Sequence, residues 1–408
     1  MRRTIFLVDM NAFFIACEAR RSAHLRDKPA AVAGDPQKRT GIVLAPNYSA
    51  RSFGIKTAMN LREAMKRCPE LITVPPDHRY YSEVSREVMT LLADYSPIVE
   101  QNSIDEAWLD MTGTENLFGS PVQAAEQIMD DLKAKLCLWC SIGISENKFL
   151  AKMASGIKKP LGITELWTEE VSAKLWPLPV GEMYGIGDKT AQKLNRLKIF
   201  TIGDLACADD HQLCRELGNH VLDLKNKANG HDQSIVTSHL REDVKSIGRS
   251  TTLAEDSHRP QDLRVILMAL AEDVGRRARE YNKKGNTVHV NLKHSDFTTI
   301  TRQTTLTEPT HYTQEIFQAG YALVEKHWPS RKSVRLVGIS LSGFDPKEKP
   351  QQLSIFDLTP LPDVSVSTNC QQKADHKILD EVMDEIRNKH GADKIVRASL
   401  LKIDMRKE

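Results

Sequence analysis

Three carboxylates at the ends of apolar segments are the feature that most constrains this chain. Asp9 closes the apolar run of residues 5–8, which is typical of a buried strand. Asp105 and Glu106 lie in the sequence Ser103-Ile104-Asp105-Glu106, between two short apolar segments that predict a tight hairpin of strands. If these strands are neighbours in one sheet, the three carboxylates meet at one edge of it.

Such a cluster has a defined chemistry. Unpaired carboxylates at close range repel each other, so the cluster needs cations to neutralise it. Ligands that are all oxygen suit Mg²⁺ or Mn²⁺ rather than zinc. Two ions about 4 Å apart are the usual arrangement for in-line phosphoryl or nucleotidyl transfer. The alternative is a set of solvated carboxylates at strand ends, and the pattern alone leaves both interpretations open.

The composition limits the architecture and the cellular compartment. A chain of 408 residues is too long for a single core and implies two to four domains. Its net charge of +2 neither requires nor excludes a nucleic-acid partner. No run approaches the roughly 18 apolar residues of a membrane span, and the N-terminus lacks the apolar region of a secretory signal. Seven cysteines, an odd number, favour reduced thiols, so we expect a cytoplasmic protein without membrane contact.

The first 232 residues divide into an alternating part and a helical part. Apolar periodicity predicts a first strand, then short strands and helices, with further elements at 30–33, 42–45, 80–95, 121–135 and 140–144. This alternation predicts an antiparallel or mixed sheet backed by two helices. The lone C-x-x-C pair, Cys137 and Cys140, has no second pair at metal spacing, and we place both in a buried strand over 136–144. Residues 168–232 predict helices joined by glycine turns.

A polar linker at 233–243 leads into a second pattern. From there to residue 344 the order is strand, helix, strand, strand, helix, strand, which is the split βαβ, ferredoxin-like unit. In the strand at 287–294 the apolar residues alternate with polar ones, so one sheet face is buried and the other wet. Residues 345–350 begin a charged tail, and helical periodicity returns near 378–386.

A glycine turn in the helical part favours contact with DNA. Gly185 and Gly187, followed by Lys189, open a helix after a short turn. Glycine lets the backbone come close to a ligand, and the free N–H groups of a helix start favour phosphate. This pattern is typical of a helix-hairpin-helix, which grips the DNA backbone without reading sequence. The alternative is a plain turn with a glycine cap.

The last strand–helix unit carries a local basic surplus. Residues 241–344 hold 16 Lys and Arg against 12 Asp and Glu. Lys and Arg on a wet sheet face suit a phosphate backbone, although ordinary solvated charge is the alternative. The candidate DNA contacts on or beside the strands are Arg249, Lys293, Arg302, Arg331, Lys332 and Arg335.

The tail carries a short segment with apolar anchors. Large apolar side chains in a polar tail have no local core to fill, so such a segment is often a docking peptide for a partner. An edge strand, or a segment docked on the same chain, is the alternative. The segment consists of Gln352, Leu353, Ser354, Ile355 and Phe356.

Together these residues resemble the Y family of translesion DNA polymerases, most closely its bacterial polymerase IV (DinB-like) branch. The resemblance runs from about Arg3 to Phe356. Its motifs are the sequences at 9–14, 47–54, 103–106, 158–162 and 352–356. Asn11 departs from the second aspartate of many relatives, and Asn11-Ala12 is also similar to the polymerase V catalytic subunit. Asn11 is not one of the three metal carboxylates, so we expect catalysis to survive this departure.

The resemblance implies roles for individual residues. Asp9, Asp105, Glu106 and the Met10 carbonyl would hold two Mg²⁺ ions, with Mn²⁺ as a substitute. Phe13 and Phe14 would contact the nucleotide, with Phe14 as the steric gate against a 2′-OH, although by itself Phe14 could be a core aromatic. The triphosphate would bind Tyr48, Arg51 and Lys159.

The resemblance also implies a fold and partners. We expect an α+β right hand with a ferredoxin-like palm (1–10 and 79–167), small fingers (11–78), a helical thumb (168–232) and a little finger (244–344) after the linker. The tail at 345–408 would carry the peptide for the sliding clamp (beta subunit). The chain would act as a monomer on primer-template DNA and dNTPs, with low fidelity. Two alternatives are another two-metal enzyme such as a nucleotide cyclase, and a catalytically silent, clamp-recruited DNA-binding factor.

Overall fold

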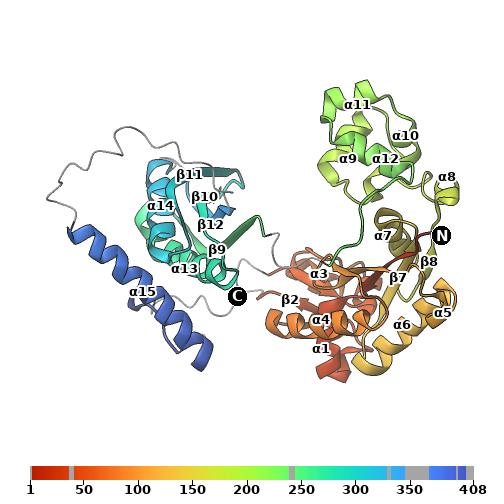
Figure 1. Cartoon of the computed structure of the whole chain (residues 1–408), viewed down its shortest axis with the longest axis horizontal. Coiled ribbons are helices and arrows are strands. Elements are labelled where there is room, and N and C mark those ends of the chain that lie inside the picture. Colours follow the sequence, from red (N-terminus) through yellow and green to blue (C-terminus); the bar gives the residue numbers. More distant parts are fainter. Residues whose placement is uncertain are drawn as a thin grey trace. The chain divides into compact units, whose positions relative to one another are not determined.

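The structure is a computed structural model of the chain that describes residues 2–35, 41–238, 244–328, 332–344, 367–391 and 394–400, with residues 367–377 described for their backbone alone. The chain divides into two compact units, residues 1–239 and 240–408. Figure 1 labels their helices and strands. Among the described residues, no helix is long and apolar enough to cross a membrane, and the cysteines are free thiols.

The first unit is built around a mixed five-stranded sheet. Its strand order is β5 (Val99–Gln101), β6 (Glu106–Asp110), β1 (Ile5–Met10), β7 (Cys140–Ser145) and β8 (Ile163–Glu165). All neighbours are antiparallel except β7 and β8, which are parallel. The central strand β1 is buried along its whole length, which explains its unbroken apolar run. The predicted mixed sheet is therefore confirmed.

Helices cover both faces of this sheet (Figure 1). Helices α4 (His78–Ala93) and α6 (Pro121–Leu136) pack their apolar sides on the face that carries Phe6 and Val8. A capping box at Ser120 fixes the start of α6. The prediction that Cys137 lies in a strand is wrong. Cys137 is instead the C-cap of α6, has the left-handed conformation with φ 52°, and is exposed.

Helix α7 (Lys148–Ile157) lies unusually close to the other sheet face. It starts at Lys148, with Asn147 as the N-cap. Gly143 of β7 makes the close approach possible, because a Cβ there would lie 2.0 Å from the Ala151 carbonyl oxygen. Any other residue at position 143 would push α7 away from the sheet.

Residues 13–74 form a smaller layer beside this sheet. Strands β3, β2 and β4 make a three-stranded sheet with β2 in the centre. This sheet has its own small core, which includes Val43, Ile55 and Leu61. The elements are α1 (Phe13–Arg21), η1 (Ala23–Leu25), β2 (Ala30–Ala33), β3 (Val43–Pro46), α2 (Tyr48–Ser52), α3 (Leu61–Arg67) and β4 (Ile72–Val74).

Residues 168–228 are helical, as predicted. They share a core that includes Leu175, Leu194 and Leu213. After these helices the chain packs again on the large sheet, where the Thr237 N–H donates to Glu100 at 2.9 Å. The elements are η2 (Thr168–Glu170), α8 (Val171–Lys174), η3 (Val180–Glu182), α9 (Asp188–Arg196), α10 (Ile202–Cys207), α11 (Asp210–Leu217) and α12 (Val221–Ala228).

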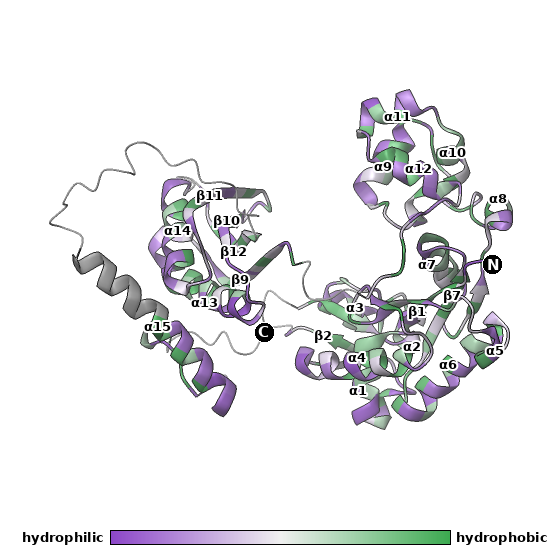
Figure 2. Ribbon diagram, in the orientation of Figure 1, coloured by the Kyte–Doolittle hydropathy of each residue, from purple (hydrophilic) through white to green (hydrophobic). Residues whose placement is uncertain are grey.

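The second unit has a four-stranded antiparallel sheet. Its strand order is β11 (Thr299–Thr310), β10 (Gly285–His294), β12 (Val334–Phe344) and β9 (Ser246–Ser257). Helices α13 (Arg264–Glu280) and α14 (Thr313–Lys326) each join two parallel strands that are separated by one antiparallel strand. This is the predicted split βαβ arrangement. Both helices mix hydrophobic and hydrophilic residues (Figure 2), as expected where one side of a helix is buried.

The register corrects the expected face of two basic residues. Arg302 is opposite Val290, and Arg249 is opposite Ile339, while both apolar partners are buried against the helices. Residues directly opposite in a sheet share a face, so both arginines project from the helix-covered side and not from the wet face. Arg249 also pairs with Asp273 of α13 at 3.2 Å.

The C-terminal helix α15 (Ser367–His390) is fastened to α13 by buried ion pairs. Asp380 is 2% exposed and lies 3.2 Å from Arg279, which also pairs with Asp384 at 2.6 Å. Arg387 contacts Glu272. The predicted helical periodicity near 378–386 is therefore confirmed, and this part of the tail belongs to the second unit.

Removing one partner of this ion-pair cluster should loosen α15. We expect Asp380→Ala to destabilise the docked helix by about 3 kcal/mol, because it leaves buried arginine charge uncompensated. Hydrogen exchange of the amides at 378–390 should accelerate accordingly. Lys389→Ala, an exposed position on the same helix, is the matched control. Unchanged exchange in Asp380→Ala would show that the cluster does not hold the helix.

Candidate functional site

The three predicted carboxylates lie on adjoining strand ends. The register of β1 and β6 places Asp9 directly opposite Glu106. The Met10 N–H donates to the Asp105 carbonyl oxygen at 2.9 Å, so Asp105 lies beside the end of β1. The Asp105 carboxylate accepts a hydrogen bond from the Ser103 hydroxyl at 2.6 Å. The expectation that the two segments are neighbours in one sheet is confirmed.

Two lysines pair with Asp9 and Glu106 of this cluster. Lys159 Nζ lies 2.6 Å from one Asp9 oxygen, and Lys152 Nζ lies 3.3 Å from the other. Lys152 also contacts the Glu106 carboxylate. Lys152 comes from α7, so the close approach that Gly143 permits carries its ammonium group to the sheet edge.

The charges of these groups depend on one another. Burial favours the neutral form of Asp9, but Lys159 and Lys152 outweigh it and hold the Asp9 pKa below its usual value. Burial and the contact with Asp9 raise the pKa of Glu106. Burial opposes the charged form of Lys152, yet Glu106 and Asp9 raise its pKa. Lys152 therefore stays charged and acts as the counter-ion of both carboxylates.

The donors at this edge fit a hard divalent cation. Asp9, Asp105 and Glu106 offer only oxygen, as does the Met10 carbonyl at the end of β1, and such donors suit Mg²⁺ or Mn²⁺. Among the described residues, no three acidic, His or Cys side chains converge on one point in this structure. Asp9 and Glu106 are instead turned to the lysines, so a cation there would take over the charge that Lys152 and Lys159 now balance.

Asn11 positions the loop that carries Lys159. Its side-chain oxygen accepts from the Leu161 N–H at 3.0 Å, and its side-chain nitrogen donates to the Ser141 hydroxyl at 3.0 Å. Both side chains are buried. No sequence pattern predicts this role, because Ser141 stands inside an otherwise apolar strand and its contact with Asn11 joins residues far apart in the chain.

The two aromatic residues after Asn11 have different surroundings. Phe13 is buried in the core of the first unit. Phe14 is half-buried and stacks on Tyr81 of α4, with ring centroids 4.6 Å apart. The Tyr81 hydroxyl donates to Glu18 at 2.7 Å, which fixes the tyrosine and, through it, the Phe14 ring. Phe14 therefore has a rigid support on its inner side.

Asn47 fixes the helix that carries Tyr48 and Arg51. Its side-chain oxygen caps α2 through the Ala50 N–H at 2.8 Å, and its amide nitrogen donates to the carbonyls of Leu25 and Lys28. The Arg51 guanidinium lies 4.8 Å from the centre of the Tyr48 ring. Burial raises the pKa of the Tyr48 hydroxyl, which is therefore a neutral hydrogen-bond donor.

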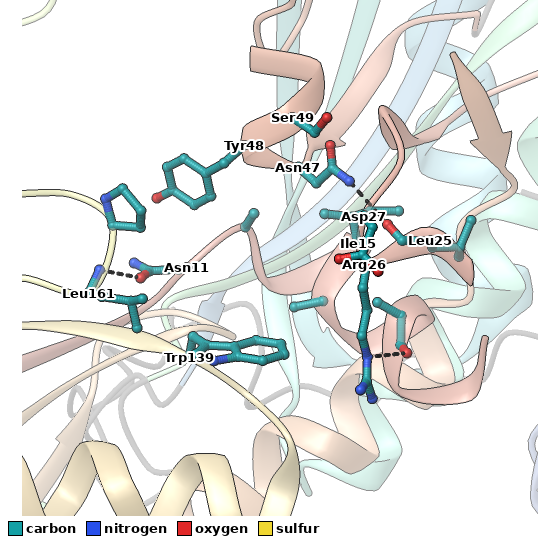
Figure 3. Close-up of a pocket in the computed structure, with 14 residues that line it drawn as sticks. Asn11, Ile15, Leu25, Arg26, Asp27, Asn47, Tyr48, Ser49, Trp139 and Leu161 are labelled. Carbon is teal, nitrogen blue, oxygen red and sulfur yellow. Dashed lines mark hydrogen bonds between the residues drawn. The ribbon is translucent and has the colours of Figure 1, made fainter. Parts of the chain in front are cut away.

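A pocket of about 350 Å³ joins these segments. The close-up in Figure 3 shows Asn11 bonded to Leu161 on one side, and Tyr48, Ser49 and Asn47 on the other. Trp139 and Ile15 also line this pocket. The start of α1, the start of α2 and the loop of Lys159 therefore surround a single hollow.

The predicted glycine turn is exposed. Gly185, with φ 94°, and Gly187 both lie at the surface before α9, as does Lys189. Gly187 is the N-cap of α9 and has no side chain to bond the first N–H groups of that helix. These N–H groups therefore point to solvent at an exposed, glycine-lined turn.

The remaining candidate residues belong to the second unit. Lys293 lies on the wet face of β10, and Arg335 lies at a bulge in β12. Arg331 and the segment 352–356 lie outside the described residues. The wet face itself carries small residues, including Gly248, Ser250, Gly338 and Ser340, which charge-based reasoning did not single out.

Family models match three parts of the chain. Residues 8–156 match the impB/mucB/samB family, residues 244–355 match the C-terminal domain of that family, and residues 168–199 match the IMS family HHH motif.

Full-length relatives match as well. DNA polymerase IV of Alkaliphilus oremlandii is 55% identical over 98% of this chain and 100% of its own length. DNA polymerase IV of Clostridium kluyveri is 52% identical over 98% of this chain and 99% of its own length. DNA polymerase IV 1 of Bacillus subtilis is 40% identical over 98% of this chain and 94% of its own length.

A solved structure shares the fold. A Y-family DNA polymerase chimera of Dbh and Dpo4 superposes with a TM-score of 0.74 and 25% identity, covering 84% of this chain and 99% of the chimera. Palm, fingers, thumb and little finger are therefore the appropriate names for the parts described above. Fold, motifs and relatives agree, and the chain belongs to the Y family of DNA polymerases, in its DNA polymerase IV branch.

Proposed function

We propose that this chain is a translesion DNA polymerase that adds dNTPs to a primer 3′-OH, directed by a template. The observation that carries this proposal is the facing pair Asp9 and Glu106, with Asp105 beside them and Lys152 and Lys159 as counter-ions. Binding alone gives no reason to bury such a cluster. We propose that the enzyme acts as a monomer with low fidelity and low processivity, because small fingers make few differential contacts with the new base pair.

Divalent-metal dependence is common to the family, and we propose two Mg²⁺ ions for this chain. Asp9, Asp105 and the Met10 carbonyl would hold the ion on the nucleotide side. Asp9, Asp105 and Glu106 would hold the ion on the primer side. When bound, the ions lower the pKa of the primer hydroxyl and stabilise charge on the transferred phosphoryl group.

The residues around the cluster would bind and orient the triphosphate. Lys159 lies at the cluster on the loop that Asn11 holds, so it can exchange its contact with Asp9 for one with phosphate. Arg51 and the neutral Tyr48 hydroxyl offer further donors from α2. These donors would stabilise negative charge on the leaving pyrophosphate.

Two surfaces would hold the DNA. The Gly185–Gly187 turn offers backbone N–H groups to a phosphate, with Lys189 beside it. In the little finger, the wet face of the sheet carries small glycine, serine and threonine residues, which would let a phosphate backbone come close to the strands. Lys293 and Arg335 lie near one end of this face. Arg249 and Arg302 project from the helix-covered side, so neither would contact DNA through the wet face.

Primer extension tests the activity directly. We expect the intact chain with Mg²⁺ and dNTPs to extend a primed template, on undamaged DNA and opposite an abasic site, with few additions per binding event. Asp105→Ala/Glu106→Ala should not extend, although it should bind DNA as well as the intact chain does. Extension by that variant would contradict the assignment of the catalytic carboxylates.

The steric gate is tested by sugar selectivity. We expect Phe14→Ala to raise ribonucleotide incorporation strongly, on the order of 100-fold, because the rigid ring that excludes a 2′-OH is removed. Single-nucleotide kinetics with dNTP and rNTP measure the ratio. Phe53→Ala, an exposed aromatic of the fingers, is the control. Equal selectivity in Phe14→Ala and the intact chain would remove Phe14 from this role.

The clamp peptide is tested by deletion. We expect removal of residues 352–356 to leave basal extension unchanged and to abolish stimulation by the sliding clamp, because the apolar anchors of the peptide are lost. The comparison is processivity on a primed circular template with and without loaded clamp. Full stimulation of the deleted chain would place clamp binding elsewhere.

The counter-ion role of Lys152 is tested by metal binding without DNA. Lys152→Met removes one positive charge from beside Asp9 and Glu106, so we expect Mn²⁺ to bind about tenfold more tightly. Electron paramagnetic resonance of free Mn²⁺ gives the affinity. Lys148→Met is the control, because Lys148 lies on the same helix as Lys152 but pairs with Glu100 of β5. Unchanged or weaker binding in Lys152→Met would refute the role.

A further inference from the structure

The hairpin between β10 and β11 has an unusual residue at its tip. The His294 N–H donates to the Thr298 carbonyl at 2.8 Å, and the Phe297 N–H donates to the His294 carbonyl at 3.0 Å. These bonds close a three-residue loop whose last residue, Phe297, has φ 65°. Glycine is the usual residue at that left-handed position of a three-residue hairpin loop, because a side chain is crowded there.

Phe297 also gains little from burial. Its side chain is 62% exposed, so an apolar ring faces solvent at a position that disfavours any side chain. A bulky residue with positive φ is an outlier, and outliers of this kind cluster at functional sites. Neither packing nor turn geometry explains a phenylalanine here.

Two cations accompany the ring. Lys293 Nζ lies 5.3 Å from the ring centre, and the Arg335 guanidinium lies 5.1 Å from it. Within the described ranges, neither has a carboxylate partner. The neighbouring Lys332, by contrast, is paired with Asp296 at 2.7 Å. The ring is therefore flanked by positive charge that is free to bind an anion.

The loop that presents the ring is internally fixed. The Asp296 carboxylate accepts from the Thr298 N–H at 3.0 Å and from its hydroxyl at 2.5 Å, in addition to Lys332. This network uses the only acidic side chain of the loop, residues 295–297, so that no carboxylate of the loop is left to repel a phosphate. The side chain of Phe297 is held outward on a rigid turn.

We propose that Phe297 is a stacking platform for an unpaired base of single-stranded DNA, with Lys293 and Arg335 binding the flanking phosphates. Exposed aromatic rings next to cations are the usual means of holding single strands, because every base has a face that can stack. Bases in a duplex already stack on each other, so the platform selects unpaired template. This inference rests on the proposed DNA-contacting role of the little finger.

The test separates base stacking from phosphate contact. Full-length Phe297→Gly is compared with the intact chain on three DNA probes: a 12-nucleotide thymidine strand, an abasic strand of equal length, and a duplex. Glycine suits the left-handed turn, so this variant keeps the hairpin. We expect binding of the thymidine strand to weaken about five- to tenfold, with the abasic strand and the duplex unchanged. Phe297→Trp should retain full binding.

The alternatives give different results. Equal affinity of Phe297→Gly and the intact chain for the thymidine strand would overturn the platform, as would an equal loss on all three probes. Loss of clamp stimulation with unchanged DNA binding would also overturn it, and would assign the ring to a protein partner. The double variant Lys293→Gln/Arg335→Gln should bind all three probes more weakly than the intact chain does. If this double variant binds all three probes as tightly as the intact chain does, the proposed DNA-contacting role of this surface is wrong, whatever the result for Phe297.

Discussion

The burial of carboxylates at the end of a central strand is the constraint on which the first unit depends. Asp9 is 6% exposed and faces Glu106, so repulsion and lost hydration would destabilise the sheet edge without nearby positive charge. The fold supplies that charge from two separate segments, α7 and the loop of Lys159. Each segment needs its own support, Gly143 for the helix and Asn11 for the loop. Much of the palm can be understood as the scaffold that keeps two ammonium groups next to two carboxylates.

The second unit uses its charges differently. Its most buried ion pairs lie on the helix side, where Arg279 and Asp380 fasten α15 to α13. The opposite face of the sheet is nearly free of charge and carries small hydroxyl and glycine residues, such as Ser250 opposite Gly338. A surface of this kind can follow a sugar-phosphate backbone without preference for a base sequence, which suits an enzyme that must act wherever replication meets damage.

Much of the fold and the site could be predicted from the sequence, and the failures have physical causes. The buried strand that carries Asp9 was evident because central strands are apolar throughout. The faces of Arg249 and Arg302 were wrong because β9 and β11 are edge strands in which few residues are buried, so the apolar pattern specifies their register only weakly. Cys137 was misplaced because a left-handed helix end leaves no periodic signal. The roles of Lys152 and Ser141 depend on contacts between residues far apart in the chain, which spacing cannot reveal.

Gly143 shows how far the distance between a lysine and a carboxylate can depend on a residue without chemistry. A Cβ at this position would need α7 to retreat by more than about 1 Å to regain ordinary van der Waals separation. Lys152 follows directly after the obstructing Ala151, so its 3.3 Å contact with Asp9 would open by a comparable amount. The position of Lys152 beside the carboxylates is thus set partly by a glycine on the same face of the sheet, away from the strand ends. Gly143 has no polar side chain, yet it determines how closely Lys152 can approach Asp9.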